Sequence, residues 1–253
     1  MAEIKISEIK LEFENASLEE YMSIIQKYRT DDRTGVKKLL EKYEKQIKKY
    51  EDELLRIENM KKYERQYDTY SYICGIDEVG RGPLAGPVCA GAVILPKDAE
   101  ILYINDSKQL SEKKREELYK EIMDVAVCAK TAFVSPEVID DINILQATFC
   151  AMREAISSLQ IKPDLLLNDA VTIPKVEIKQ VPIIKGDAKS VSIAAASIVA
   201  KVERDHLMEK YDELYPEYGF AKNKGYGSKG HIEAIKKYGP CPIHRSTFIK
   251  NLI

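Results

Sequence analysis

The stretch "CGIDEVGRGPLAGPVCAGAVIL", residues 74–95, is the most informative part of the chain. Two apolar runs with the pattern of buried strands flank a segment rich in glycine and proline, and Asp77 and Glu78 follow the first run. Two like charges at the end of a buried strand are costly unless one is exposed or both are compensated. The two acids can converge on one centre only if the chain turns there, and Gly80 and Gly82 would allow such a turn.

Two further segments repeat this arrangement of an acid after a strand. "DLLLNDA" ends a strand-like run on Asp169, and "VPIIKGDAK" ends another on Asp187. Because sites are built at strand ends in sheets flanked by helices, we expect these acids to gather. An all-oxygen donor set suits Mg²⁺ or Mn²⁺ rather than zinc, and two such cations serve in-line displacement at phosphorus. The sequence therefore indicates metal-dependent phosphodiester hydrolysis.

The glycine-rich segment does not match the common phosphate-binding loops. A Walker A loop needs Lys and Ser or Thr after its last glycine, but Pro87 and Val88 follow Gly86. A dinucleotide-binding fingerprint needs its last glycine to open a helix, whereas residues 88–95 have a strand pattern. The remaining interpretation of this segment is a tight turn whose backbone N–H groups can closely approach a sugar or a phosphate. One group that such a turn could contact is the 2′-hydroxyl of a ribose.

Residues 71–253 alternate short apolar runs with helical patterns, which indicates a sheet flanked by helices. We predict strands at residues 72–76, 88–95, 125–134, 164–167 and 181–184. A predicted helix at about residues 144–158 allows a parallel crossover between the third and fourth strands. Ser111 and Ser192 are predicted to cap two further helices, and the alanines after Ser192 would let its helix approach the sheet closely.

Residues 1–70 differ from the rest, with a single glycine and no proline. Apolar residues from Leu40 to Ile57 recur every three or four positions, which predicts a long amphipathic helix after a shorter one at about residues 18–28. We predict a helical extension over residues 1–70 that packs on itself, with a coiled-coil dimer seam as the alternative. The catalytic domain would span residues 71–253.

Composition restricts the class of protein. The chain has 253 residues, of which 45% are hydrophobic and 32% charged, as in a folded globular protein. No signal-peptide pattern or membrane-length apolar run is present, so we expect a cytoplasmic location and no membrane partner. The cysteines form no CxxC pair and the three histidines have no metal-binding spacing, which argues against a zinc site. The net charge of −2 does not exclude nucleic acid, because local patches decide its binding.

Six segments occur in an order that resembles ribonuclease HII, the type 2 ribonuclease H of bacteria. They are "GIDEVGRGPLAGPV", "NDSKQLSEKKREELY", "DDINILQATFCAM", "IIKGDAKSVSIAAASIVAKVERD", "YGFAKNKGYGSKGHIEAI" and "YGPCPIHRSTF". The resemblance covers about residues 72–250. It implies an α/β, ribonuclease-H-like fold, with a mixed five-stranded sheet flanked by helices and a helical C-terminal region. It also implies an endonuclease that hydrolyses the RNA strand of RNA–DNA hybrids.

By the same resemblance, four acids hold two Mn²⁺ or Mg²⁺ ions and carry catalysis. They are Asp77, Glu78, Asp169 and Asp187. The resemblance also implies cutting on the 5′ side of a single ribonucleotide embedded in duplex DNA, leaving 3′-hydroxyl and 5′-phosphate ends, an activity of replication and DNA repair. One member of the pattern is absent, since Ala170 follows the third acid where many members of the family have glycine.

Five residues match positions at which the family contacts its substrate. Gly80, Arg81 and Gly82 match the motif that senses the 2′-hydroxyl, Tyr226 matches a tyrosine that packs on the next deoxyribose, and Lys108 matches a lysine near the phosphates. The expected partner is an RNA–DNA hybrid or a DNA duplex containing ribonucleotides, and we expect the protein to be a monomer.

Two other functions stay open at this point. The first is another carboxylate-metal nuclease of the same fold, such as a junction resolvase or an exonuclease, which would cut all-DNA substrates. The second is a non-catalytic protein that binds hybrids. Within the resemblance, Arg81 and Asp187 favour ribonuclease HII over the sister type, ribonuclease HIII, which usually has another glycine motif and a glutamate as the fourth acid.

Overall fold

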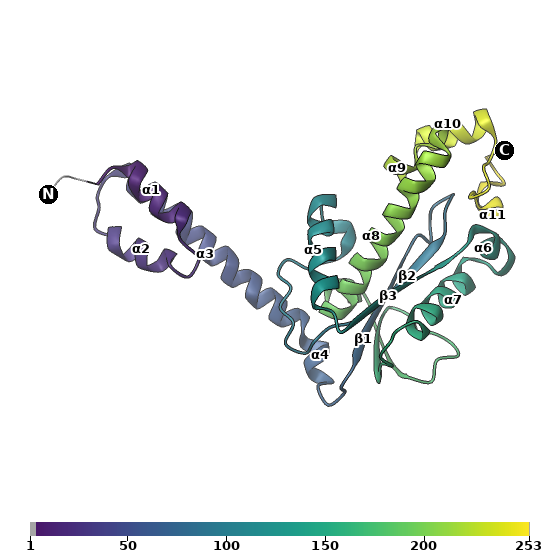
Figure 1. Cartoon of the computed structure of the whole chain (residues 1–253), viewed down its shortest axis with the longest axis horizontal. Helices are drawn as coiled ribbons and strands as arrows, with labels where there is room; N and C mark the ends of the chain where they lie inside the picture. The colour runs from purple at the N-terminus through teal and green to yellow at the C-terminus, as the bar shows by residue number, and fades with distance from the viewer. Residues whose placement is uncertain (1–3, 253) are drawn as a thin grey trace. The chain divides into compact units, whose positions relative to one another are not determined.

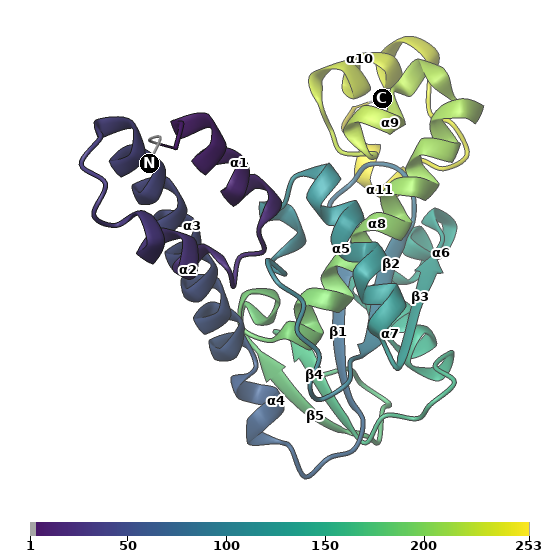
Figure 2. The same ribbon diagram turned by 60° about the vertical axis from the view of Figure 1, so that its left-hand side comes forward.

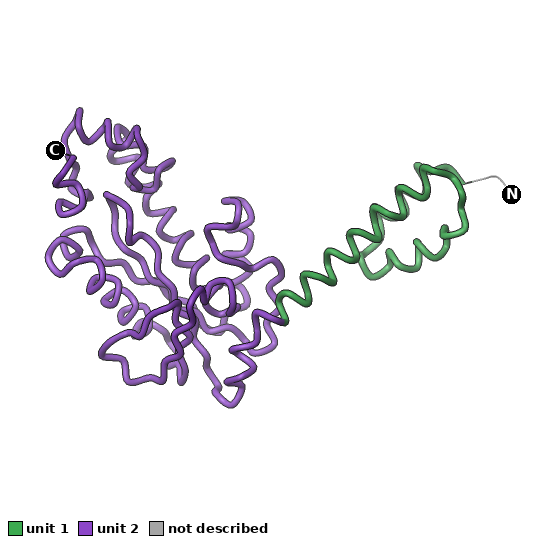
Figure 3. The backbone as a smooth tube through the Cα atoms, turned by 180° about the vertical axis from the view of Figure 1, so that it is seen from behind, with its two compact units in different colours: residues 1–58 green, residues 59–253 purple. Residues whose placement is uncertain are grey.

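The structure, a computed structural model, describes residues 4–252. The chain divides into two compact units, Met1–Glu58 and Asn59–Ile253 (Figure 3). The first contains α1 (Ile6–Asn15), α2 (Tyr21–Tyr28) and most of α3 (Thr34–Met60). The second contains the sheet and all of the predicted site residues.

The first unit has its own core, as expected for an amphipathic helix folded against its neighbours. Its buried residues come from all three helices: Ile9, Phe13, Ile24, Ile25, Tyr28, Val36, Leu40, Tyr43 and Ile47. The rings of Phe13 and Tyr43 stack with their centroids 4.0 Å apart. The apolar stripe of α3 is therefore covered by α1 and α2 over this part of its length.

The second unit contains one mixed sheet of five strands, which confirms the predicted fold class (Figure 1). The strands are β1 (Ile73–Val79), β2 (Val88–Ile94), β3 (Cys128–Val134), β4 (Leu165–Asp169) and β5 (Lys179–Ile183), in the order β3-β2-β1-β4-β5. β1 pairs antiparallel with β2, and β2 with β3, whereas β1, β4 and β5 are parallel. The predicted strands are all present, with ends displaced by a few residues.

Helices cover both faces of the sheet (Figure 1). α8 (Val191–Leu214) lies on one face with α5 (Glu112–Val125) beside it, and α6 (Pro136–Ile142) and α7 (Ile144–Ser157) lie on the other. α7 provides the predicted crossover, but β3 and β4 are not neighbours, because β2 and β1 lie between them. α8 packs so closely that a Cβ atom on Gly75 would overlap the backbone of Ser192.

One predicted helix start is wrong by two residues. Ser190, and not Ser192, caps α8, with its Oγ accepting from the N–H of Ile193 at 3.2 Å. The N–H of Ser192 donates instead to Oε1 of Glu64, at 3.1 Å. Glu64 lies in α4 (Lys62–Gln66), far away in the sequence, so a local pattern could not reveal it. The predicted cap of α5 by Ser111 is confirmed.

The C-terminal region is helical, as predicted. Beyond the end of α8 it forms a group of short elements: η3 (Pro216–Tyr218), α9 (Phe220–Asn223), α10 (Lys229–Tyr238) and α11 (Ser246–Ile249) (Figure 2). Its core includes Ala85 from the glycine-rich segment together with Met208, Phe220 and Ile235. This packing ties the C-terminal region to the loop after β1. Within residues 4–252, no helix is long and apolar enough to cross a membrane.

Candidate active site

The four predicted acids lie on elements that meet at one edge of the sheet. Asp77 and Glu78 are in β1, Asp169 ends β4, and Asp187 lies in η2 (Gly186–Ala188) after β5. Because β1 and β4 are parallel neighbours, their carboxyl ends lie side by side. Oδ1 of Asp169 also accepts a hydrogen bond from the N–H of Gly186 at 2.7 Å, which ties the segment bearing Asp187 to β4.

The chain does not turn at the paired acids, contrary to the expectation from their sequence. Asp77 pairs with Gly91 and Glu78 with Ala90 in a ladder that continues to Val79, and the turn follows at Gly80, where φ is +89°. Successive side chains in such a strand alternate between its faces. Within residues 4–252, no three Asp, Glu, His or Cys side chains already have the arrangement of a metal-binding cluster.

Three of the four carboxyl groups lack sufficient compensation for their charge. Asp77 is only 5% exposed, and its pKa is raised by burial and by Glu78, against a hydrogen bond from Ser197. Burial also raises the pKa of Glu78, although Arg81, with Nη1 3.2 Å from Oε1, opposes this. Burial and the charges of Asp106 and Asp169 raise the pKa of Asp187. A donor set of buried, repelling oxygens fits a hard divalent cation and does not suit zinc.

Lys108 faces these acids from η1 (Ser107–Gln109). Burial would lower the pKa of Lys108, but the charges of Asp77, Asp106 and Asp187 outweigh it and raise the pKa. Sequence reasoning missed Asp106, whose Oδ1 accepts from the N–H of Lys108 at 2.9 Å and so fixes the turn. Its position in the sequence could have indicated this role, because Asp106 directly precedes Ser107 and Lys108 within one of the segments that carry the resemblance.

The structure brings the glycine motif and Tyr226 together. The N–H groups of Leu84 and Ala85 donate to the carbonyl oxygen of Gly225 at 2.8 and 3.3 Å. A Cβ atom on Gly82 would lie 3.8 Å from Cε1 of Tyr226, whose side chain is exposed. Gly82 and Tyr226 therefore form one exposed surface directly after the strand that carries Asp77.

Two fully buried arginines hold these loops, and sequence reasoning missed both. Arg245 donates to the carbonyl oxygens of Gly80, Arg81 and Gly86 at 2.5, 2.9 and 2.8 Å. Neither arginine forms an ion pair with a carboxylate in the described part of the chain. Their side chains donate to backbone carbonyl groups instead, those of Ala85, Pro87 and Lys224 in the case of Arg204. The charged guanidinium groups of the two arginines therefore hold the backbone of these loops in position.

A buried histidine pair fixes the carbonyl group of Tyr226. Nδ1 of His244 accepts from the N–H of Cys241 at 2.9 Å, so the proton of a neutral His244 lies on Nε2. This Nε2 donates to Nε2 of His231 at 3.0 Å, and Nδ1 of His231 donates to the oxygen of Tyr226 at 2.8 Å. Burial lowers the pKa of both histidines, which keeps them neutral at pH 7.

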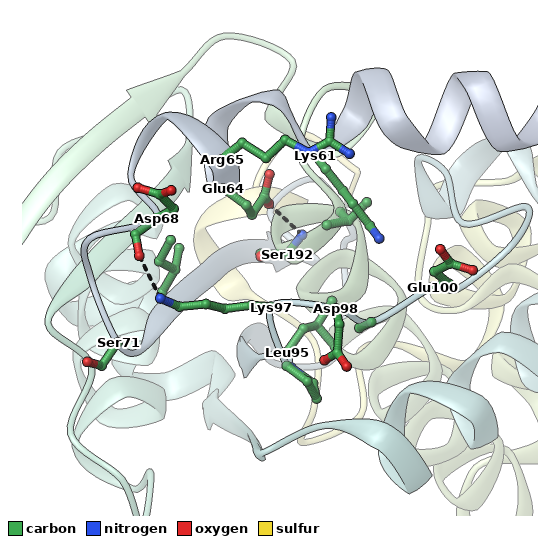
Figure 4. A pocket seen from close by; sticks show the side chains of 14 residues that line it. Lys61, Glu64, Arg65, Asp68, Ser71, Leu95, Lys97, Asp98, Glu100 and Ser192 are labelled. Carbon is green, nitrogen blue, oxygen red and sulfur yellow. Dashed lines mark hydrogen bonds between the residues drawn. The ribbon is translucent and has the colours of Figure 1, made fainter.

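A separate cavity of about 290 Å³ lies near the start of β1 (Figure 4). Figure 4 shows Glu64 of α4 bonded to Ser192 and Lys97 bonded to the backbone of Asp68. Glu64 also accepts from Oγ of Ser190 at 2.5 Å. None of the predicted site residues lines this cavity, and the hydrogen bonds of Glu64 to Ser190 and Ser192 fasten α4 to the start of α8.

Two family models match the chain over most of its length. The model described as Ribonuclease HII matches residues 74–251, which include all of the predicted site residues. The chain belongs to the ribonuclease HII family. A second model, Ribonuclease HII N-terminal domain, matches residues 5–68. The protein is therefore an endoribonuclease of the ribonuclease H type that hydrolyses the RNA strand of hybrids, and its family implies dependence on a divalent cation.

Relatives and solved structures agree with membership of the ribonuclease HII family. The Ribonuclease HII of Lachnoclostridium phytofermentans is 64% identical over 98% of both chains, and that of Clostridioides difficile is 50% identical over the full length of both. The crystal structure of ribonuclease H2 from Pyrococcus horikoshii matches with a TM-score of 0.60 and 31% identity, over 72% of this chain and 96% of that one. A complex of PCNA with RNase HII from Archaeoglobus fulgidus has the same TM-score at 29% identity, over 71% of this chain and 96% of that one.

Ala170, which follows the third predicted acid, has a backbone conformation that favours glycine. Its φ is +55°, in the left-handed region that glycine adopts without steric cost. The N–H of Ala170 donates to the oxygen of Ile183 at 3.0 Å, which extends the pairing of the parallel strands β4 and β5 beyond Asp169. The backbone therefore keeps a conformation suited to glycine even with alanine present.

Proposed function

We propose that this protein cuts on the 5′ side of a ribonucleotide, both in hybrids and at a single ribonucleotide embedded in duplex DNA, leaving 3′-hydroxyl and 5′-phosphate ends. One observation carries the proposal: Gly82 and Tyr226 form a joint surface directly after the strand that bears Asp77. To recognise one sugar beside the scissile bond, the surface that contacts the sugar must lie next to the acids that carry out the chemistry.

Asp77, Glu78, Asp169 and Asp187 would hold two Mn²⁺ or Mg²⁺ ions. When bound, such ions activate the attacking water and stabilise the leaving oxygen. The raised pKa values of Asp77, Glu78 and Asp187 support this assignment, since a nearby cation would stabilise their ionised forms. Lys108, whose pKa is raised by three of the surrounding acids, would keep its charge and contact a phosphate of the substrate.

The sugar would be read by Gly80, Arg81, Gly82 and Tyr226. Gly82 lacks a Cβ atom and is exposed, so a ribose can approach the backbone and its 2′-hydroxyl can meet a backbone group. The exposed ring of Tyr226 offers a flat surface for the following deoxyribose. Arg81 is half exposed and bound to Glu78, which places its guanidinium between an acid and the approaching strand.

A labelled DNA duplex with one embedded ribonucleotide tests the proposal. With Mn²⁺ or Mg²⁺ we expect a single cut on the 5′ side of the ribonucleotide, and we expect EDTA to abolish it. The matched control is the same duplex with a deoxyribonucleotide at that position, which should stay intact. Equal cutting of both duplexes would support a resolvase or exonuclease, and binding without cutting would support a non-catalytic protein.

The two substitutions Tyr226→Ala and Tyr226→Phe separate the ring from its hydroxyl. Loss of a stacking ring costs about 1–3 kcal/mol, so we expect Tyr226→Ala to lower kcat/KM for the embedded ribonucleotide by roughly 5-fold to 150-fold. Tyr226→Phe keeps the ring and should stay within about 3-fold of the wild type. Steady-state cleavage of the labelled duplex measures both. An equal loss in the two variants would assign the contact to the hydroxyl and contradict the proposed packing.

A further inference from the structure

Helix α3 of the first unit carries a row of lysines on one side. Lys38, Lys42, Lys45 and Lys49 follow one another at intervals of four, three and four residues, and all four are exposed. With 3.6 residues per turn, this spacing places the four side chains within about 60° around the helix axis, over a length of about 16 Å. We call these four residues the lysine face.

The lysine face lies opposite the core of its own unit. The buried residues Val36, Leu40, Tyr43 and Ile47 of α3 point about 180° away from it, toward α1 and α2. The lysine face is therefore the outer side of this helical unit. None of its ammonium groups forms an ion pair or hydrogen bond within residues 4–252, and that of Lys42 lies 5.1 Å from the ring centroid of Tyr43.

The positive charge is concentrated on α3 against the trend of the unit. Residues 1–58 contain 12 Lys and Arg against 14 Asp and Glu, whereas residues 37–49 contain six lysines and two acids, Glu41 and Glu44. A helix that only needs solubility mixes the two signs. Four aligned lysines instead match an extended row of negative charges, and about 16 Å corresponds to about five base pairs of a duplex.

We infer that the lysine face binds the phosphate backbone of the nucleic-acid duplex on which the enzyme acts. The inference rests on the proposed function, because it assigns a second contact to the same substrate. Lysines contact phosphates as point charges and read no sugar or base, so this contact adds affinity without specificity. The inference predicts that loss of these lysines weakens the binding of hybrids and of all-DNA duplexes equally, and that salt strongly weakens this contact.

Two double variants of the full-length protein test the inference. Lys38→Gln with Lys45→Gln removes two charges from the lysine face, and Lys5→Gln with Lys10→Gln removes two exposed charges elsewhere in the same unit. Glutamine preserves helix propensity, and the thermal unfolding midpoint checks that both variants fold. Binding to a hybrid and to an all-DNA duplex is measured in EDTA across a range of salt concentrations, together with kcat in Mn²⁺ at saturating substrate.

We expect the lysine-face variant to bind both duplexes at least about 5-fold more weakly at 0.1 M salt, with a slope of log K against log salt reduced by about 2. Its kcat should equal that of the control variant. If the two variants bind alike while the wild type still cuts the embedded ribonucleotide, the inference is wrong and the proposed function stands. If the wild type fails to cut an embedded ribonucleotide but the affinities differ as expected, the proposed function is wrong and the lysine face still binds duplexes.

Discussion

Replacement of Asp77 by asparagine is expected to reduce hybrid cleavage by about 1000-fold or more while leaving hybrid binding intact. Asp77 is the most buried of the four acids, and Ser197 and the N–H of Glu78 hold its side chain in place. Asparagine preserves the shape of the side chain but removes the charge needed to hold a cation. Single-turnover cleavage and binding in EDTA separate the two effects.

The same variant has an expected effect on stability that does not depend on cleavage. Because the ionised form of Asp77 is disfavoured by burial and by Glu78, its removal should raise the unfolding midpoint of the metal-free protein at pH 7. Mn²⁺ at about 100 times its Kd should stabilise the wild type by about 2.7 kcal/mol, or several degrees, and the variant by much less. Asp124→Asn, an exposed acid on α5, is the control. Equal stabilisation of all three proteins by Mn²⁺ would exclude Asp77 as a ligand.

The sequence allowed correct prediction of those features that depend on neighbouring residues. The strands were recognisable because their apolar runs are short and bounded by glycine, proline or acids, and the acids stood out as charges after buried runs. The geometry at Asp77 and Glu78 was predicted wrongly, because a turn was expected where Gly91 and Ala90 of β2 keep both acids in the ladder. Only the partner strand, which follows the loop, determines this.

Contacts between distant segments were beyond a reading of one sequence. Arg204 and Arg245 look like ordinary charged residues of a helix and a loop, and nothing near them in the chain indicates complete burial. Their acceptors are carbonyl groups, which have the same chemistry in every residue and leave no sequence pattern. Resemblance to a family suggested Gly80 and Tyr226 as substrate contacts, whereas the groups that hold these residues could be identified only from the fold.

Replacement of Arg245 by lysine is expected to destabilise the protein by about 3–5 kcal/mol and to loosen the loop that we propose reads the sugar. One ammonium group cannot replace the hydrogen bonds that the planar guanidinium donates to the carbonyl oxygens of Gly80, Arg81 and Gly86, so carbonyl acceptors lose their donor, at about 1–3 kcal/mol each. Thermal unfolding should show a midpoint lower by roughly 10 °C. The exposed Arg29→Lys is the matched control and should change neither property.

A merely structural role for Arg245 would lower stability and leave substrate discrimination unchanged. We therefore compare kcat/KM for the embedded ribonucleotide with kcat/KM for a long hybrid, at a temperature well below the midpoint of the variant. On the duplex with a single ribonucleotide, only one position of the enzyme leads to cleavage, so cleavage there depends most on the correct placement of Gly80 and Arg81. The kcat/KM for this duplex should therefore fall at least about 10-fold further than the kcat/KM for the hybrid. Equal losses on the two substrates would show that Arg245 supports the fold alone.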